Sequence, residues 1–317
     1  MNMMDAFPEN TDNVEGLVEL VAVLTAVTHG QARVLTVDNG QTLLNGPLLP
    51  IHRSLQAGVR VWVAKKTAQP MGYVEQLYTF IDATRQNERG LPVLYVSYLG
   101  LVREVDEQVL SHTAKWRDWY DYFPWEDTRH ARYHHIVETI LPFIRRWANT
   151  ADTETSRLER LNRFHLCWGQ PPYEWSEENV LLRYELLYEV GLIAEAPKIA
   201  HDFDISLTGL AMAHDHRRVL ATAMSRLRAK IKYRPVVYEL LPPQFTLLQL
   251  QQCVEALVGR NLHKQNFRRQ VQHQDLIEPV IGCMSNGVGR PAQLYRFKDN
   301  ILLESLISDI KLPLSKS

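Results

Sequence analysis

The segment FTLLQLQQCVEALVGRNLHKQNFRRQ, residues 245–270, decides how the C-terminal part of the chain folds. Thr246 is a favourable N-cap for a helix over residues 247–258, and Gly259 supplies the left-handed conformation that commonly ends a helix. After a tight turn, the pattern predicts a second helix over residues 263–274. Two helices joined by a short turn that contains glycine form a helix-turn-helix.

The second helix has one apolar face and one basic face. Phe267 and Val271, four residues apart, are expected to face inward. The outward side chains are then Gln265, Arg268, Arg269 and Gln272. Arginine can read guanine and glutamine can read adenine in the major groove, and the same cations bind phosphate. For an isolated helix, however, a solvated basic face is the commoner explanation.

The next segment changes that balance in favour of DNA binding. A short strand, LIEPVI, a loop from Gly282 to Gly289 and a returning strand, RPAQLYRF, predict a hairpin with Arg290 at its base. A helix-turn-helix followed by such a hairpin is a winged helix, in which the wing contacts the DNA backbone or the minor groove. The side chains expected at the DNA are Thr246, Lys264, Gln265, Asn266, Arg268, Arg269, Gln272 and Arg290.

Length and composition indicate an ordinary globular protein. A chain of 317 residues suggests about two domains, and 45% apolar with 22% charged residues can form a core in each. No signal-peptide pattern or apolar run of membrane-spanning length is found, so we expect a cytoplasmic protein. The three cysteines, Cys167, Cys253 and Cys283, show no CxxC spacing and predict neither disulfides nor a zinc site.

The charges are divided unevenly along the chain, although the formal net charge is only −1. Residues 1–213 carry 19 Lys and Arg against 28 Asp and Glu, whereas residues 214–300 carry 14 against 6. Such a division is typical of a protein in which one domain meets a polyanion and the other has a separate task. It predicts a domain boundary near residue 214.

The acidic part begins with sheet-forming sequence. The apolar runs in residues 17–37 have the β-branched content of buried strands, and Asp38-Asn39-Gly40 is a turn signal. The elements predicted next are a helix over 52–66, a strand over 73–80, a polar loop over 82–90 and a strand over 92–102. This alternation indicates an α/β or α+β domain.

Helical periodicity follows from about residue 126 to residue 200. One helix is expected in residues 129–148 and another in residues 177–196, the latter opened by Ser176. A further amphipathic helix is predicted over residues 215–232 and should connect the two domains. Its apolar stripe is Val219, Leu220, Ala223, Met224, Leu227 and Ile231. The basic side chains expected away from that stripe are Arg217, Arg218, Arg226, Arg228, Lys230 and Lys232.

These segments resemble a known family. FTLLQLQQCVEALVGRNLHKQNFRRQV followed by GRPAQLYRF is similar to the DNA-binding domain of NrtR, the Nudix-related transcriptional regulators of bacterial NAD metabolism. HDHRRVLATAMSRLRAKIKYRPVVYELLP resembles the family's linker, and YVEQLYTFIDATRQNERGLPVLYVSYLGLV and AKWRDWYDYFPW resemble Nudix strands. IHRSLQAGVRVWVAKKT and the helical insertion are closer to the related repressor family NadQ. The resemblance covers most of the chain outside about 126–205.

The resemblance implies an α+β fold in which a Nudix-like α/β/α sandwich with a helical insertion precedes a winged helix-turn-helix domain. The implied domains are residues 1–213 as effector sensor, with the insertion at about 126–205, residues 214–240 as linker helix and residues 241–317 as the winged helix. It also implies a homodimeric repressor of NAD biosynthesis genes that binds a palindromic operator.

The Nudix resemblance raises an enzymatic alternative, a nucleotide pyrophosphatase whose winged helix mediates dimerisation. Active Nudix hydrolases hold Mg²⁺ with clustered glutamates of the Nudix box. The corresponding segment here, Gly46 to Gly72, contains no Asp or Glu, and Ala64, Lys65 and Lys66 stand where the acidic pair is expected. We therefore predict no enzymatic activity and no catalytic residues. Neither His134-His135 nor His214 with His216 has metal-ligand spacing, so no metal site is predicted.

A Nudix fold without its carboxylates can still bind a nucleotide. Strand alternation places Gln76, Tyr78 and Phe80 on one face of residues 73–80, and the resemblance places that strand near the ligand. Arg53 and Arg60 are candidates for phosphate contacts. The alternatives are that the aromatic rings belong to the core and that the arginines are surface residues. The implied effector is an adenine nucleotide, with ATP placed first and NAD or ADP-ribose as the other possibilities. The aromatic segment 116–125 is expected to be core or dimer packing rather than a platform for bases.

Overall fold

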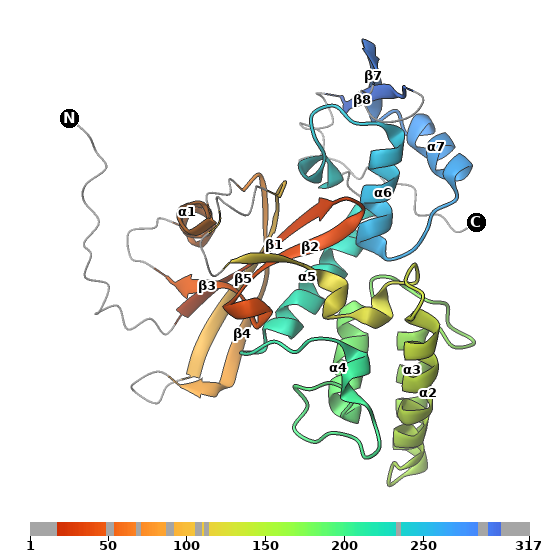
Figure 1. The fold of residues 1–317 in the computed structure, drawn as a ribbon. Coiled ribbons are helices and arrows are strands. Elements are labelled where there is room, and N and C mark those ends of the chain that lie inside the picture. Colours follow the sequence, from red (N-terminus) through yellow and green to blue (C-terminus); the bar gives the residue numbers. More distant parts are fainter. Residues whose placement is uncertain are drawn as a thin grey trace, which may run out of the picture.

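The structure is a computed structural model. It describes residues 18–48, 54–67, 71–86, 92–104, 110, 114–232, 236–284 and 291–298. Figure 1 shows three parts: a sheet with helices on its faces, a helical lobe, and a small domain at the end opposite to that lobe. No helix in these ranges has the length and hydropathy that a membrane crossing requires.

The six-stranded sheet has the order β4-β5-β1-β3-β2-β6. Its strands are β1 (Val18–Thr28), β2 (Gln31–Val37), β3 (Thr42–Pro47), β4 (Tyr73–Gln86), β5 (Pro92–Leu101) and β6 (Lys115–Asp118). The pair β1 and β5 is parallel, and the other pairs are antiparallel. Strand β4 continues to Gln86, so residues 82–86, predicted as loop, are part of the sheet.

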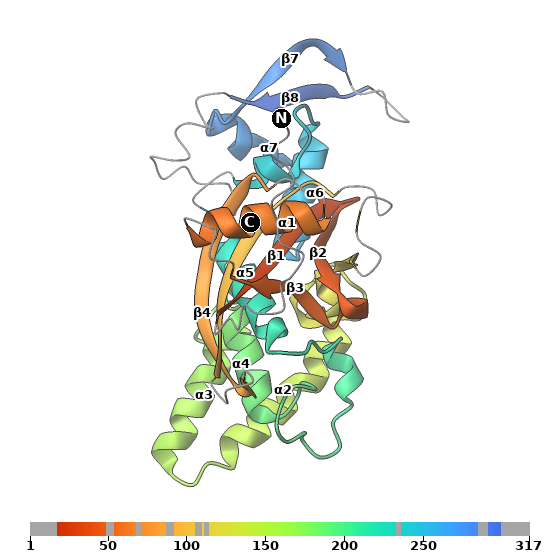
Figure 2. The same ribbon diagram turned by 90° about the vertical axis from the view of Figure 1, so that its left-hand side faces the viewer.

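Helices cover both faces of this sheet, which makes it an α/β/α sandwich. Helix α1 (Leu55–Thr67) lies across one face, where Val59 and Val63 join the side chains of β1 in one core cluster (Figure 2). Helix α5 (His216–Ile231) lies on the other face and contacts β1, β4 and β5. The helix predicted as a connection between domains is therefore also one layer of the sandwich.

Helix α5 corrects one prediction about its basic residues. Its apolar stripe is buried as predicted, but Arg217 and Arg228 are buried too, with side chains that are 0% exposed. Arg217 donates hydrogen bonds to the carbonyls of Tyr122 and Thr208 and pairs with Glu195. These two arginines therefore lie between α5 and neighbouring elements rather than in water, whereas Arg226 of the same helix is exposed as predicted.

The helical lobe consists of α2 (Tyr133–Asn149), α3 (Glu154–Trp168) and α4 (Val180–Val190). The prediction that Ser176 opens the last helix was wrong, because α4 starts at Val180 after a turn. The Ser176 carbonyl instead accepts a hydrogen bond from Arg183, and the acidic residues after Ser176 form ion pairs with Arg260 and Lys232. Tertiary contacts thus hold these residues outside the helix.

The aromatic segment before the lobe is core, as predicted. Trp119, Tyr122, Phe123 and Trp125 are fully buried in the short 3-10 turns Trp119–Asp121 and Pro124–Glu126 and beside them. They contribute to the core cluster that lies on the α5 face of the sheet. Stacking of bases on these rings is therefore excluded in this conformation.

The C-terminal domain is a winged helix, which confirms the predicted fold class. It contains α6 (Leu247–Val258), α7 (Lys264–His273), β7 (Ile277–Met284) and β8 (Gln293–Phe297), preceded by the 3-10 turn Val236–Leu240. Phe245 pairs with Tyr295 through two backbone hydrogen bonds of 2.9 and 2.8 Å. The segment before α6 is thereby fixed to the hairpin.

A candidate nucleic-acid interface

Helix α6 is capped at both ends as the sequence predicts. The Thr246 hydroxyl oxygen accepts from the backbone N–H of Gln249 (3.2 Å), and the Gln249 side chain accepts from the N–H of Thr246 (2.8 Å), which completes a capping box. Gly259 ends the helix with φ of 73°. The Thr246 hydroxyl, expected at the DNA, thus also has a structural partner.

The turn between α6 and α7 is held by side chains that the sequence analysis did not single out. Glu255 accepts hydrogen bonds from the Leu262 N–H (2.8 Å) and from Gln251 (2.9 Å), and Gln251 also donates to the Leu262 carbonyl (3.0 Å). The sequence feature that could have predicted these bonds is a glutamine and a glutamate four residues apart, just before the glycine that ends the helix. These bonds fix the angle at which α7 leaves the turn.

Helix α7 presents the predicted basic face. Phe267 (2% exposed) and Val271 (0%) face the core of the winged helix. The exposed side chains are Lys264, Gln265, Arg268, Arg269 and Gln272, and Asn266 is half-buried. Neither arginine forms an ion pair within the described ranges. Both guanidinium groups are therefore available to an external anion.

Acidic groups near α7 are already engaged. The Asp275 carboxylate, just after the helix, lies 2.5 Å from the Lys298 ammonium, and the Glu278 carboxylate lies 2.6 Å from the Arg296 guanidinium. Glu255 accepts the turn hydrogen bonds described above. The face of α7 therefore combines free arginines with amide side chains, the groups that bind phosphate and read base edges in a major groove.

The wing follows α7 directly. Strands β7 and β8 are antiparallel, and β7 bulges between Pro279 and Met284, where Gly282 has φ of 73°. The bulge lengthens β7 beyond the predicted strand and leaves Ile281 95% exposed. Arg290, predicted at the base of the wing, lies outside the described residues.

The predicted ligand residues do not share one face of β4. A bulge between Gln76 and Thr79 changes the alternation. Gln76 lies 3.5 Å from the Tyr98 hydroxyl, on the α1 face, whereas Phe80 packs on the α5 face with the Arg218 guanidinium 5.7 Å from its ring centroid. The prediction that Gln76, Tyr78 and Phe80 share one face assumed strict alternation along the strand. It was wrong because the bulge shifts the register of β4 between Gln76 and Thr79.

The structure also describes Tyr78 and Arg60, two of the other predicted ligand residues. Tyr78 is half exposed, with Arg226 5.9 Å from its ring centroid. Arg60 donates a hydrogen bond to the Met71 carbonyl, so part of its guanidinium already has a partner. Arg53 lies outside the described residues. The residues that the structure does describe are thus divided between the two faces of the sheet and do not form a single cluster.

Helix α1 lies within residues 46–72, the segment predicted to correspond to the Nudix box. Val59 and Val63 are buried, while Ala64 and Lys65 are exposed. The residues from Gly46 to Gly72 include no carboxylate side chain. Across the described residues, no group of three or more His, Cys, Asp or Glu side chains is arranged to hold a metal ion.

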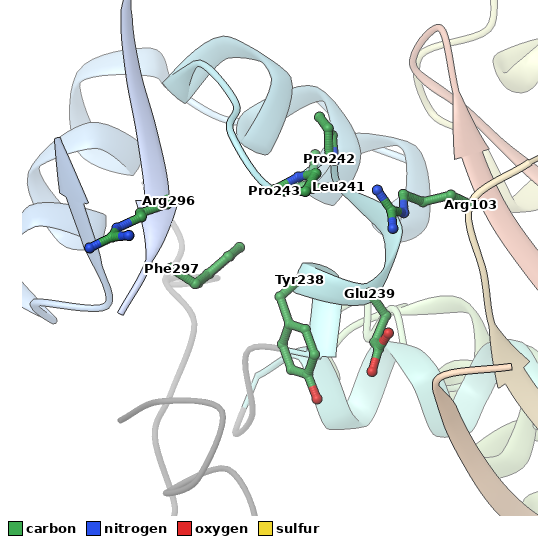
Figure 3. A pocket seen from close by; sticks show the side chains of 8 residues that line it. All are labelled: Arg103, Tyr238, Glu239, Leu241, Pro242, Pro243, Arg296 and Phe297. Atoms are coloured by element: carbon green, nitrogen blue, oxygen red, sulfur yellow. The ribbon is translucent and has the colours of Figure 1, made fainter. Parts of the chain in front are cut away.

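A cavity of about 350 Å³ lies where the winged helix meets the sandwich (Figure 3). Its lining is Arg103, Tyr238, Glu239, Leu241, Pro242, Pro243, Arg296 and Phe297. Arg296 and Arg103 lie on opposite sides, and Arg296 already pairs with Glu278. Burial raises the pKa of the Glu239 carboxyl, against the opposing effect of nearby Arg103 and Arg60. None of the predicted ligand residues lines this cavity.

Comparisons with known proteins agree with this architecture. The family model of the NrtR DNA-binding winged helix domain matches residues 237–297. A relative from Acinetobacter baylyi, the "ADPR responsive transcriptional repressor NtrR", is 41% identical over 88 residues. That match covers 28% of this chain and 35% of the relative, so the chain spans about a third of that protein's length.

Solved structures extend the likeness to the whole fold. NrtR from Shewanella oneidensis, crystallised with a 27mer DNA, superposes with a TM-score of 0.53 at 22% identity, covering 93% of this chain and 97% of that one. A second structure of Shewanella oneidensis NrtR gives the same TM-score at 20% identity, covering 92% of this chain and 97% of that one. Residues 237–297 thus match the NrtR DNA-binding winged helix domain, and the chain as a whole shares the fold of the Shewanella protein, a Nudix-like sandwich followed by a winged helix.

Proposed function

We propose that this protein is a DNA-binding transcriptional repressor. The observation that carries the proposal is the exposed face of α7, where Arg268 and Arg269 have no ion pair in the described chain, inside a winged helix of the NrtR type. The Shewanella protein of the same fold was crystallised with DNA, and the Acinetobacter relative is named a repressor. We expect α7 to enter the major groove and the wing to contact the flanking backbone.

We further propose that the sandwich binds an adenine nucleotide and does not hydrolyse it. The residues of the Nudix-box position supply no carboxylate for Mg²⁺, which favours a sensor over a pyrophosphatase. Of the three effectors implied by the resemblance, the name of the Acinetobacter relative favours ADP-ribose over ATP and NAD. Formation of AMP from ADP-ribose in the presence of Mg²⁺ would contradict this part of the proposal.

The remaining elements of the proposal are a homodimer, a palindromic operator and control of NAD biosynthesis genes, with the protein acting in the cytoplasm. One winged helix reads only a few base pairs, so two copies related by a two-fold axis would supply the required site length. Equal binding of nucleotide to the DNA-competent and incompetent dimers would change nothing, so the effector must prefer one of them.

The test is fluorescence anisotropy on labelled promoter DNA at several salt concentrations, with and without ADP-ribose, NAD and ATP. Arg268→Ala or Arg269→Ala should weaken operator binding by about 1–3 kcal/mol if the side chain contacts a base, and each lost phosphate contact should lower the salt slope by about 1. Arg145→Ala is the matched control, because Arg145 is an exposed arginine of the helical lobe. Wild-type affinity in both α7 variants would refute the assignment of α7.

A further inference from the structure

The C-terminal end of α6 is held by groups that come from outside the winged helix. The last carbonyls of a helix have no partner within that helix. Here the Tyr120 hydroxyl donates to the Ala256 carbonyl (2.6 Å), and the Arg228 Nε–H donates to the Leu257 carbonyl (2.9 Å). The N–H and the hydroxyl of Thr128 donate to the Gly259 carbonyl at 2.7 and 2.8 Å.

The protonation of Tyr120 and the charge of Arg228 both favour these hydrogen bonds to the end of α6. Burial raises the pKa of Tyr120 to about 12, so its hydroxyl keeps its proton and remains a donor. The Arg228 guanidinium places a positive charge at the negative end of the α6 dipole. The α6 end and the sandwich are therefore joined by directional bonds as well as by apolar contact.

Arg228 belongs to a buried triad of charges. Its Nη1 lies 2.6 Å from Oε2 of Glu126, and Arg183 binds the same carboxylate through both oxygens, with Nε to Oε1 at 2.5 Å and Nη2 to Oε2 at 2.9 Å. All three side chains are 0% exposed. A buried ion pair often contributes little net stability, because desolvation offsets the attraction. Its directional bonds do, however, fix how the elements lie against one another.

The helical lobe supplies one member of the triad and supports it. Arg183 lies on α4, its Nη1 donates to the carbonyls of Cys167 (2.9 Å) and Ser176 (3.0 Å), and its guanidinium lies 3.8 Å from the Trp175 ring centroid. From the same lobe, Glu177 accepts from Arg228 through its carbonyl and pairs with Arg260 of the α6–α7 turn at 2.6 Å. The lobe thus contacts the helix-turn-helix both through the triad and directly.

We propose that the helical lobe is a brace that fixes the recognition helix α7 relative to the sandwich, with Arg183, Glu126 and Arg228 as its positioning residues. The inference rests on the proposed function as a dimeric repressor and gives the lobe its role in it. A braced α7 lies at a fixed distance from the dimer axis, so the protein should demand one spacing between operator half-sites.

The test uses Arg183→Met in the full-length chain. This change removes one cation of the triad and leaves Glu126 paired with Arg228, so no buried charge loses its only partner. Arg163→Met is the matched control, because Arg163 also pairs with a glutamate, Glu189, but at the surface of the same lobe. Arg183→Lys, which keeps the charge, serves if Arg183→Met does not fold, as judged by circular dichroism.

Operator binding is measured on duplexes whose half-sites are moved apart or together by one base pair. We expect the wild type and the control to bind the correct spacing at least 10-fold more tightly than the altered ones. The Arg183 variant should show a several-fold smaller ratio and weaker binding at the correct spacing. An unchanged ratio and affinity in a folded Arg183 variant would overturn the proposal.

A second measurement separates this inference from the proposed function. If the wild type binds no DNA specifically, the repressor assignment is wrong, but the brace still predicts faster amide hydrogen exchange at the end of α6 and in the α6–α7 turn of the Arg183 variant. The control should leave exchange there unchanged. Equal exchange rates in the variant, the control and the wild type would refute the brace on their own.

Discussion

Gly259 offers a test of the contact between the winged helix and the sandwich, because a second glycine provides its reference. Gly259 and Gly30 have almost the same positive φ, 73° and 74°. A methyl group on Gly30 would meet nothing within 4 Å. On Gly259 it would press against the Glu126 carbonyl oxygen and lie 2.9 Å from the Tyr120 hydroxyl and 3.1 Å from the Arg228 guanidinium.

The two substitutions should therefore differ by the cost of that contact alone. Gly30→Ala should destabilise the protein by roughly 1–2 kcal/mol, the cost of the left-handed conformation for alanine. Gly259→Ala carries the same cost and adds about 1–3 kcal/mol of overpacking, because the nearest neighbour is backbone that cannot rotate away. For a chain of 317 residues, 1 kcal/mol corresponds to about 1.5 °C, so the Tm of Gly259→Ala should lie about 2–5 °C below that of Gly30→Ala.

The assay is thermal unfolding of both variants, monitored by circular dichroism under identical conditions. Operator binding below the transition gives an independent readout, since only Gly259→Ala should displace the α6–α7 turn. Equal Tm values for the two variants, with equal DNA affinity, would show that α6 does not dock against Glu126 and would refute the described junction.

Three further predictions concern single side chains. Thr246→Ala removes the capping box with Gln249 and should cost about 1 kcal/mol, measured by urea unfolding, whereas Thr246→Ser should cost less. Burial raises the pKa of Glu239, so its ionisation lowers stability as pH rises through the folded pKa; Glu239→Gln should therefore raise Tm at pH 7 and lose this advantage toward pH 4, and a pH-independent difference would contradict it. The Cys253 thiol is 2% exposed and its pKa is raised to about 12 by burial, so a thiol reagent should modify it only after unfolding.

Local signals made the winged helix predictable from the sequence. The cap at Thr246, the end at Gly259 and the inward pair Phe267 and Val271 all depend on residues within a few positions of one another. Short-range rules apply to such features because the partner is close in the chain. The side chains predicted to face outward from α7 are therefore exposed in the structure.

Long-range partners explain what the sequence could not show. The local sequence of α5 does not distinguish Arg228 from an arginine on the protein surface. Its burial depends on Glu126, which lies 102 residues away in the chain. The bulge after Gln76 likewise depends on how β4 pairs with β5, so strict alternation gave the wrong face for part of that strand. The residues of an effector site likewise could not be predicted from local patterns, because the fold must bring them together.

The continuity of the apolar core has a consequence for how the protein unfolds and is degraded. One cluster of buried side chains runs from Val21 in the sheet, through Leu187 of the lobe and Leu227 of α5, to Leu257 and Val271 in the winged helix. A core shared in this way couples the stability of its parts, so we expect sandwich and winged helix to unfold in one transition. A destabilising substitution in the sheet, far from the winged helix, would then lower the amount of folded protein by exposing the whole chain to proteases at once.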